Sequence, residues 1–389
     1  MKNLYQGDRG ILVSYMQLAL KRAGYPLLVD GIFGTDTCRA LADFLQTDRT
    51  PDRICVVDRS VWEKLLPYLR GYATEEGKNR ILFEDPVTSV EVPYTSLLTA
   101  VVIDGLLARY PFLKSGEIGK SVMGKPISYL EIGNGEKEVF YNASFHANES
   151  ITTPVLLKFA EEYAQAYEKG TTLYGVPAAE LFEEYRLFLV PLVNPDGVDL
   201  VNGLHTDGGY YRRAQQIASD YPAIPFPSGW KANIEGIDLN LQFPAGWENA
   251  KRIKYAQGYT KPAPRDYVGE APLTAPESEA VYAFTRSHDF RLILAYHTQG
   301  EVIYWKYLDY EPARSYEIAQ YFGRVSGYTV EETPAQSGYA GYKDWFIQEY
   351  DRPGYTIEAG MGENPLPMSD FAGIYRDNAG ILLGGMTQI

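Results

Sequence analysis

Hydrophobic side chains recur at helical spacing in three segments of the first 70 residues. Over 11–24 the apolar positions are Leu12, Tyr15, Met16, Ala19 and Leu20, with Gly24 where a helix C-cap belongs. After a turn-rich stretch, a second stripe consists of Thr37, Ala40, Leu41, Phe44 and Leu45. A third begins at Ser60-Val61-Trp62-Glu63, which has the form of a capping box, and continues to Leu69. The pattern predicts three amphipathic helices.

The pattern changes further along the chain. Residues 71–92 are polar and aperiodic, as expected of a linker. Beyond them, helical stretches such as 96–110 and 153–168 alternate with short apolar runs of strand character: 139–145, 185–193, 291–296 and 355–357. Such alternation is typical of an α/β domain with helices on both faces of its sheet. We therefore predict a three-helix domain over 1–70, a linker over 71–92 and an α/β domain over 93–389.

Composition narrows the functional classes. A chain of 389 residues with 45% hydrophobic and 22% charged residues fits two soluble domains, and no apolar run approaches the roughly 18 residues of a membrane span. A net charge of −14 argues against nucleic acid or anionic membrane as a partner. The N-terminus lacks an apolar signal-peptide core, which favours a cytoplasmic or spore-associated location over secretion. The oligomeric state stays open.

The two cysteines, Cys38 and Cys55, both lie in the predicted three-helix domain. They are too few for a disulfide scaffold and wrongly spaced for a zinc knuckle, so we expect buried free thiols. A bond between them would instead indicate an oxidising compartment.

Potential metal ligands follow several of the predicted strands. His146 and Glu149 form a His-x-x-Glu pair between the run 139–145 and the next helix, and His297 directly follows the run 291–296. Glu358 follows the last run. Each alone would be read as an ordinary polar residue at a strand end. Ligands of open α/β sheets bind outside the carboxyl ends of strands, so the four should converge, and imidazole plus carboxylate suits zinc.

In order along the chain, these segments resemble the zinc carboxypeptidase family. The matching elements are Gly119 to Pro126, His146 with Glu149, Asn194-Pro195-Asp196-Gly197, Arg212-Arg213, Gly236-Ile237-Asp238-Leu239-Asn240, His297 and Glu358. The resemblance covers most of residues 94–389. It implies a carboxypeptidase-like mixed sheet and one zinc ion.

The resemblance also implies roles for the site residues. His146, Glu149 and His297 would be the zinc ligands, with one coordination position left for water. Glu358 matches the general base and Arg212 the arginine that stabilises the oxyanion. Because Arg213 is adjacent, either of the two arginines could match the oxyanion arginine. If Arg212 has that role, Arg213 is a substrate-binding candidate.

Two departures from the family pattern concern the substrate. The family carries Asn-Arg after its Gly-Val-Asp segment, and this arginine clamps the terminal carboxylate of an exopeptidase substrate. Here the pair is Asn240-Leu241, so Asn240 remains a substrate-binding candidate while recognition of an ordinary C-terminus must be moved or lost. For the tyrosine that covers the substrate, Tyr339 is preferred over Tyr342.

Residues 5–69 resemble a peptidoglycan-binding domain. The shared elements are Gly7-Asp8, Gln17 to Leu20, Asp30-Gly31-Ile32-Phe33-Gly34 and Phe44-Leu45-Gln46. The alternative is a helical bundle that merely packs on the second domain.

The combination of such a module with this catalytic domain resembles the architecture of the γ-D-glutamyl-diamino acid peptidases of bacteria. That branch implies peptidoglycan and muropeptides as partners and the γ-D-glutamyl-diaminopimelate bond as the target. Arg212, Arg213 and Lys231 are basic residues near the motifs that could face such an acidic substrate. The alternatives are a metallocarboxypeptidase of other specificity and a wall-binding protein with an inert peptidase domain.

Overall fold

One mixed sheet forms the centre of the α/β domain in the computed structural model, which describes residues 2–46, 55–71 and 85–389. Its strand order is β11-β10-β12-β9-β5-β8-β4-β3. The bounds are β3 Lys114–Lys120, β4 Pro126–Ile132, β5 Lys137–Ala143, β8 Tyr185–Val190, β9 Leu292–His297, β10 Val302–Tyr304, β11 Thr329–Glu331 and β12 Gly354–Glu358. The central strands β12, β9, β5 and β8 are parallel, whereas β10 and β4 run antiparallel to their central neighbours. The predicted mixed sheet is confirmed.

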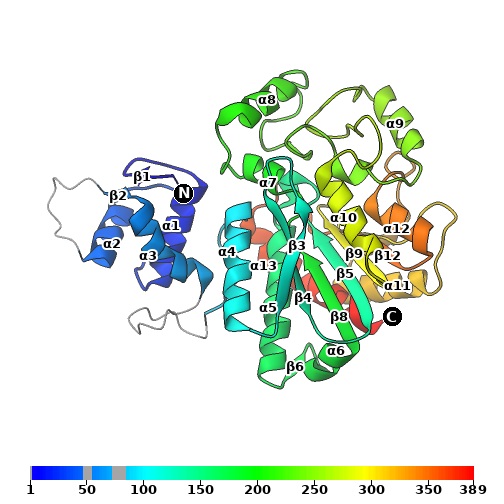
Figure 1. Ribbon diagram of the computed structural model, residues 1–389, viewed down its shortest axis with the longest axis horizontal. Helices are drawn as coiled ribbons and strands as arrows, with labels where there is room; N and C mark the ends of the chain where they lie inside the picture. Colours follow the sequence, from blue (N-terminus) through cyan, green and yellow to red (C-terminus); the bar gives the residue numbers. More distant parts are fainter. Residues whose placement is uncertain (1, 47–54, 72–84) are drawn as a thin grey trace.

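Helices cover both faces of the sheet, as predicted (Figure 1). One face carries α4 Ser96–Arg109, α5 Thr152–Glu168, α11 Ser315–Ser326 and α13 Phe371–Thr387; the other carries α10 Pro276–Arg286 and α12 Tyr342–Tyr350. Alternate side chains of β9 serve the two layers: Leu292, Leu294 and Tyr296 join one core, while Ile293 and Ala295 join the other. Because side chains alternate between the two faces along a strand, this alternation determines the face of the sheet on which each strand-end residue lies.

The connections at the carboxyl ends of the central strands are long and carry short helices. They comprise η1 Ala147–Glu149, α7 Pro195–Val201, α8 Gly208–Ser219, η2 Leu239–Leu241, α9 Trp247–Ala256 and η3 Met368–Asp370. Elsewhere α6 Ala178–Glu184 follows the small hairpin of β6 Thr172–Leu173 and β7 Val176–Pro177. Within the described residues, none of the helices is long and apolar enough to cross a bilayer.

The N-terminal module consists of the three predicted helices and a two-stranded ribbon. Its elements are β1 Leu4–Tyr5, α1 Ile11–Arg22, α2 Thr35–Leu45, β2 Val56–Val57 and α3 Arg59–Arg70. Gln17 is buried and binds the turn before α2: its Nε2 donates to Asp30 Oδ1 at 2.8 Å, and its Oε1 accepts from Gly31 N at 2.8 Å. Two of the motifs that carry the resemblance therefore hold each other in place.

The cap of α3 differs from the prediction. Asp58 is the N-cap residue, and its Oδ1 accepts from Val61 N at 3.0 Å. Ser60 lies inside the first turn and donates to the same Asp58 oxygen at 2.8 Å. The predicted Ser60 capping box was wrong because a better acceptor stands two residues earlier.

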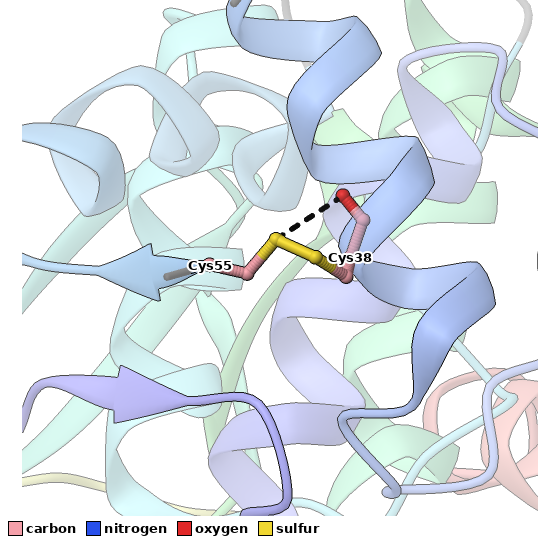
Figure 2. The surroundings of a disulfide bond; sticks show 2 residues. All are labelled: Cys38 and Cys55. Carbon is pink, nitrogen blue, oxygen red and sulfur yellow. Dashed lines mark hydrogen bonds between the residues drawn. A yellow bond between two sulfur atoms is a disulfide. The ribbon is translucent and has the colours of Figure 1, made fainter. Parts of the chain in front are cut away.

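Cys38 and Cys55 form a disulfide, so the prediction of free thiols was also wrong (Figure 2). The bond joins α2 to the residue before β2, with Cα atoms 5.7 Å apart. Closing a segment of this length stabilises a fold by roughly 3 kcal/mol, mainly through the unfolded chain. Spacing alone could not reveal the bond, because the packing of α2 against the residue before β2 is a tertiary feature.

The module is docked on the α/β domain through α3 and α4 (Figure 1). Gly105 permits this close packing, since a Cβ there would lie 2.1 Å from the Arg70 carbonyl oxygen. Arg22 donates to carbonyl oxygens on both sides of the junction: Tyr68, Leu69, Pro86 and Val87. Of the predicted linker, residues 72–84 lie outside the described residues, whereas 85–92 is a packed segment whose Val87 and Thr88 N–H groups donate to the buried Glu161.

Candidate metal centre

The turn after β5 carries the His-x-x-Glu pair. Ser144 adopts a left-handed backbone conformation (φ 56°), which turns the chain sharply away from the strand. Its hydroxyl contacts those of Thr152 and Thr153 at 3.0 and 2.9 Å, and so ties the turn to the start of α5. The short helix η1 then places His146 and Glu149 on the same side of the turn. Backbone strain of this kind persists where surrounding contacts enforce it, as they do here.

His297 completes a compact set of ligand atoms. Its Nδ1 lies 3.1 Å from His146 Nδ1 and 3.1 Å from Glu149 Oε2, and His146 Nδ1 lies 3.0 Å from Glu149 Oε1. The candidate ligand atoms of the three residues all lie within 4.8 Å of one another. Ligands at about 2.0–2.2 Å from a tetrahedral zinc ion have mutual separations of this order. The residues present therefore fit one zinc ion.

Asp238 orients the first ligand from behind. Its Oδ1 lies 3.2 Å from His146 Nε2, and an imidazole that donates there keeps its Nδ1 lone pair for a metal. Burial alone would lower the pKa of His146, but Glu149 and Asp238 together outweigh it and raise the pKa to about 9. This site concentrates negative charge, which a bound cation compensates.

Glu149 contacts a lysine in addition to the two histidines. Lys231 Nζ lies 2.9 Å from Glu149 Oε1, with only 17% of the lysine side chain exposed. Burial would raise the pKa of Glu149, but His146 and Lys231 together hold that pKa well below its usual range. The carboxylate is thus kept ionised, as a metal ligand must be.

Glu358 ends β12 directly beside His297, because the two residues are register partners in the parallel pair β12–β9. It shares a sheet face with Thr356, opposite to the core residues Tyr355 and Ile357. Burial, reinforced by the negative charge of Glu149, raises the pKa of Glu358 to about 7. A carboxyl group near the metal ligands, with a pKa near neutrality, suits proton transfer.

Two cavities meet at this centre. Cavity 1, of about 520 Å³, is lined by residues 223–225, 228 and 229 and by neighbours of the ligands such as Asn148 and Thr298. Cavity 2, of about 350 Å³, is lined by His146, Asn240 and Leu241 among others. Both cavities share four lining residues: Lys231, Arg265, Tyr304 and Glu358. This junction is where a substrate bond would be exposed to the metal and to Glu358.

Not every predicted substrate residue lies at this junction. Asn240 lines cavity 2, and its Oδ1 accepts from Tyr342 N at 3.0 Å. Tyr339 lines neither cavity and packs against Tyr307, with ring centroids 6.5 Å apart. The tyrosine that faces both cavities is Tyr304.

The arginine pair lies further away. Arg212 and Arg213 are exposed on α8 and line neither cavity. The oxyanion role of Arg212 stays a prediction, and the structure instead places Lys231 and Arg265 at the junction. In the sequence, Lys231 is a basic residue near the motifs, whereas Arg265 stands in no recognised motif and its role could not be predicted. The signal for Lys231 was its position five residues before the Gly236–Asn240 segment.

The chain belongs to the zinc carboxypeptidase family, whose profile matches residues 99–379. It is therefore a zinc metallopeptidase, in agreement with the His-Glu-His set. Gamma-D-glutamyl-L-diamino acid endopeptidase 1 of Lysinibacillus sphaericus is 48% identical over 285 residues, which cover 73% of this chain and 70% of that protein. The uncharacterized protein YqgT of Bacillus subtilis (strain 168) is 44% identical over 283 residues, covering 72% and 73%.

Solved structures show the same fold at low sequence identity. Thrombin activatable fibrinolysis inhibitor aligns with a TM-score of 0.61 at 16% identity, covering 98% of this chain and 99% of that one. Carboxypeptidase A from Helicoverpa armigera aligns with a TM-score of 0.57 at 20% identity, covering 90% and 94%. The predicted family and carboxypeptidase-like fold are confirmed. The family profile begins after the N-terminal module, whose peptidoglycan-binding character stays a prediction.

Proposed function

We propose that this zinc peptidase hydrolyses the bond between the γ-carboxyl of D-glutamate and a diamino acid in peptidoglycan stem peptides. The observation that carries the proposal is the junction of cavities 1 and 2 at Glu358, beside the metal ligands. A peptide can extend from the scissile bond into both cavities. The endopeptidase of Lysinibacillus sphaericus, 48% identical, supports the choice of bond.

Leu241 favours this activity over that of an ordinary carboxypeptidase. It occupies the position of the exopeptidase arginine, lines cavity 2, and is only 8% exposed because it packs with Trp247 and Val268. A leucine cannot form paired hydrogen bonds with a carboxylate. A free α-carboxylate at the chain terminus therefore has no guanidinium partner at this position.

The residues at the junction divide the chemistry among them. His146, Glu149 and His297 would hold the zinc ion, which would supply a Lewis acid for the scissile carbonyl and for the attacking water. Glu358 accepts the proton of the attacking water and delivers it to the leaving amine. Lys231 provides a fixed positive charge where negative charge develops on the carbonyl oxygen.

The test uses the tripeptide L-Ala-γ-D-Glu-diaminopimelate, with the products identified by mass. We expect L-Ala-D-Glu and free diaminopimelate, formed far more slowly by a Glu358→Gln variant of equal zinc content. A blocked α-linked dipeptide is the comparison substrate. Faster hydrolysis of that dipeptide would identify a metallocarboxypeptidase of other specificity, whereas inactivity on both with zinc absent would identify an inert peptidase domain.

The N-terminal module supplies a second part of the proposal, which is binding to the wall polymer. Its groove, of about 610 Å³, lies between the Gln17 turn and α2 and includes the exposed side chain of Leu28. In the full-length chain, Leu28→Asp should reduce co-sedimentation with insoluble peptidoglycan and leave tripeptide hydrolysis unchanged. Unaltered co-sedimentation would favour a helical bundle without a wall-binding role.

The disulfide supports work in an oxidising compartment, because cytosolic thiols are usually kept reduced. This proposal departs from the cytoplasmic location expected from the N-terminus. Thiol labelling of the protein taken directly from its native cells tests it. Labelling of both cysteines without added reductant would restore the cytoplasmic expectation.

A further inference from the structure

Arg265 is the one cation at the cavity junction whose hydrogen-bonding groups are mostly uncommitted among the described residues. It lines cavities 1 and 2, and its Nε donates to Asp266 Oδ2 at 2.7 Å. Within the described part of the chain, neither of its Nη groups has a hydrogen-bond partner. The lysines of the same cavities instead place their single nitrogen against a carboxylate: Lys231 on Glu149, Lys254 on Asp266 and Lys343 on Asp344.

The position of this guanidinium is fixed through the metal centre. Asp266 has a left-handed backbone conformation (φ 65°), and its N–H donates to Asp238 Oδ2 at 3.1 Å. The other oxygen of Asp238 contacts His146, while Asp266 Oδ1 accepts from Lys254 at 2.5 Å. A chain of two carboxylates thus connects Arg265 to a metal ligand. A left-handed aspartate costs about 1 kcal/mol, and these contacts hold it in place.

A solvated surface arginine would not show these features. The side chain of Arg265 is 42% exposed, but its Nε is anchored on Asp266 and the residue lines both cavities, so the guanidinium is held at the cavity junction. Guanidinium groups form paired hydrogen bonds with carboxylates, with both geometric and energetic selectivity. Cavity 2 has no arginine at position 241 to meet such a group.

We propose that Arg265 binds a free carboxylate of the substrate next to the scissile amide and so determines specificity; this inference rests on the proposed function. A γ-linked D-glutamate keeps its α-carboxylate free, whereas an α-linked peptide has none at that place. The diamino acid on the other side of the bond also carries carboxylates. Arg265 faces both cavities and can meet either source.

Substrate amidation distinguishes the two sources. The parent is L-Ala-γ-D-Glu-diaminopimelate; one analogue carries the D-Glu α-carboxyl as an amide, and another carries both diaminopimelate carboxyls as amides. For the zinc-loaded full-length protein we expect one amidation to lower kcat/KM by roughly 10- to 100-fold, mainly through KM. The sensitive analogue identifies which carboxylate Arg265 binds.

Variants then link this carboxylate to Arg265. Arg265→Gln should lower kcat/KM on the parent by a similar factor and abolish the effect of the sensitive amidation, while Arg265→Lys should recover part of the loss. The matched control is Arg252→Gln, an exposed arginine on α9 that lines neither cavity. In a Glu358→Gln background, calorimetry should show weaker binding of the parent when Arg265 is also replaced.

Several results would overturn the inference. Equal losses of Arg265→Gln on all three substrates would place the guanidinium at the reaction centre instead of on a carboxylate. Wild-type insensitivity to both amidations would exclude carboxylate binding, whatever the variants do. If the wild type hydrolyses none of the γ-linked peptides, the proposed function fails and this inference fails with it; hydrolysis with an unchanged Arg265→Gln rate overturns the inference alone.

Discussion

The active site has two walls that are built differently. The strand-end wall consists of His146, Glu149, His297 and Glu358, which sit on or directly after β5, β9 and β12. The loop wall consists of Lys231, Asp238 and Arg265, which lie outside the helices of the long connection between β8 and β9. Sheet register fixes His297 and Glu358, which are paired residues, and the short turn that follows β5 places His146 and Glu149 beside them. Side-chain hydrogen bonds must fix the loop wall.

Those side-chain bonds are buried and come from several segments. Asn194 Nδ2 donates to the carbonyl oxygens of Phe145 and Ala232, and so ties the turn after β5 to the loop wall. Glu277 accepts from Asn233 Nδ2 at 3.1 Å on the same loop. A wall held in this way depends on individual polar groups, each of which costs free energy when its partner is removed. The strand-end wall should therefore tolerate change in its surroundings better than the loop wall does.

The largest effect is expected at the strand-end wall. His297→Ala removes one of three ligands, so the protein should lose most of its zinc and at least about three orders of magnitude in kcat/KM. Zinc per chain, measured by atomic absorption, is the readout. His205→Ala, remote from the ligand set, serves as the control and should keep its zinc; full occupancy in His297→Ala would place the third ligand elsewhere.

Glu358→Gln should separate metal binding from proton transfer within the same wall. All three ligands remain, so zinc content should equal that of the wild type, while kcat falls by about 10²- to 10⁴-fold because the proton acceptor is gone. Single-turnover hydrolysis of the tripeptide measures the loss. Activity close to wild type would remove Glu358 from the role of base.

A pair of variants tests whether the oxyanion charge belongs to the loop wall or to α8. Lys231→Ala should lower kcat by about 10²- to 10³-fold, since it removes the junction cation that contacts the metal ligand Glu149. Arg212→Ala, on the exposed face of α8, should stay within about a factor of two. Steady-state kinetics on one substrate decides between them, and the reverse order would return the role to Arg212.

The smallest effect concerns Glu277, which supports the loop wall, and the pH dependence of the free energy of unfolding that it causes. Burial raises the pKa of Glu277 to about 7, above its unfolded value, so the folded state holds the proton more tightly. Its stabilising contribution is full below the unfolded pKa of about 4.3 and is lost as the pH rises through 7. Urea unfolding should show a loss on the order of 2 kcal/mol between pH 5 and 8.

Glu277→Gln should flatten this dependence, because an amide cannot ionise. Exposed Glu279→Gln on the same helix is the matched control and should keep the wild-type slope. A slope that is unchanged in Glu277→Gln would assign the pH dependence to another group.

The same contrast explains what could be predicted from sequence. Apolar periodicity predicts β5, β8, β9 and β12, and residues that follow parallel strands meet at one edge of the sheet. The sequence therefore predicts that His146, Glu149, His297 and Glu358 lie together, as they do in the structure. The helices at 96–109 and 152–168 were equally well marked. For these elements, the local sequence pattern is enough to predict where the strand-end residues lie in the fold.

The loop wall offered no such pattern. Arg265 reaches the junction through the left-handed conformation of Asp266, which no spacing rule encodes. The order of the motifs predicts Arg212 as the oxyanion arginine, yet its side chain is exposed on α8. The disulfide has a related explanation, since Cys38 and Cys55 are brought together by the packing of α2 and β2 in the module. Residues on connections acquire their neighbours only from tertiary structure.

The docked module matters for a polymeric substrate. A module on a flexible tether explores a volume set by tether length, and the effective concentration of the second site falls as that length grows. Here Arg22 and Glu161 fasten the segment 85–92 between the module and the α/β domain. The groove and the metal centre are then separated by a constant vector. With the wall binding proposed for the module, this constant distance would limit any gain in avidity to polymer whose anchoring and cleavable positions are spaced to match it.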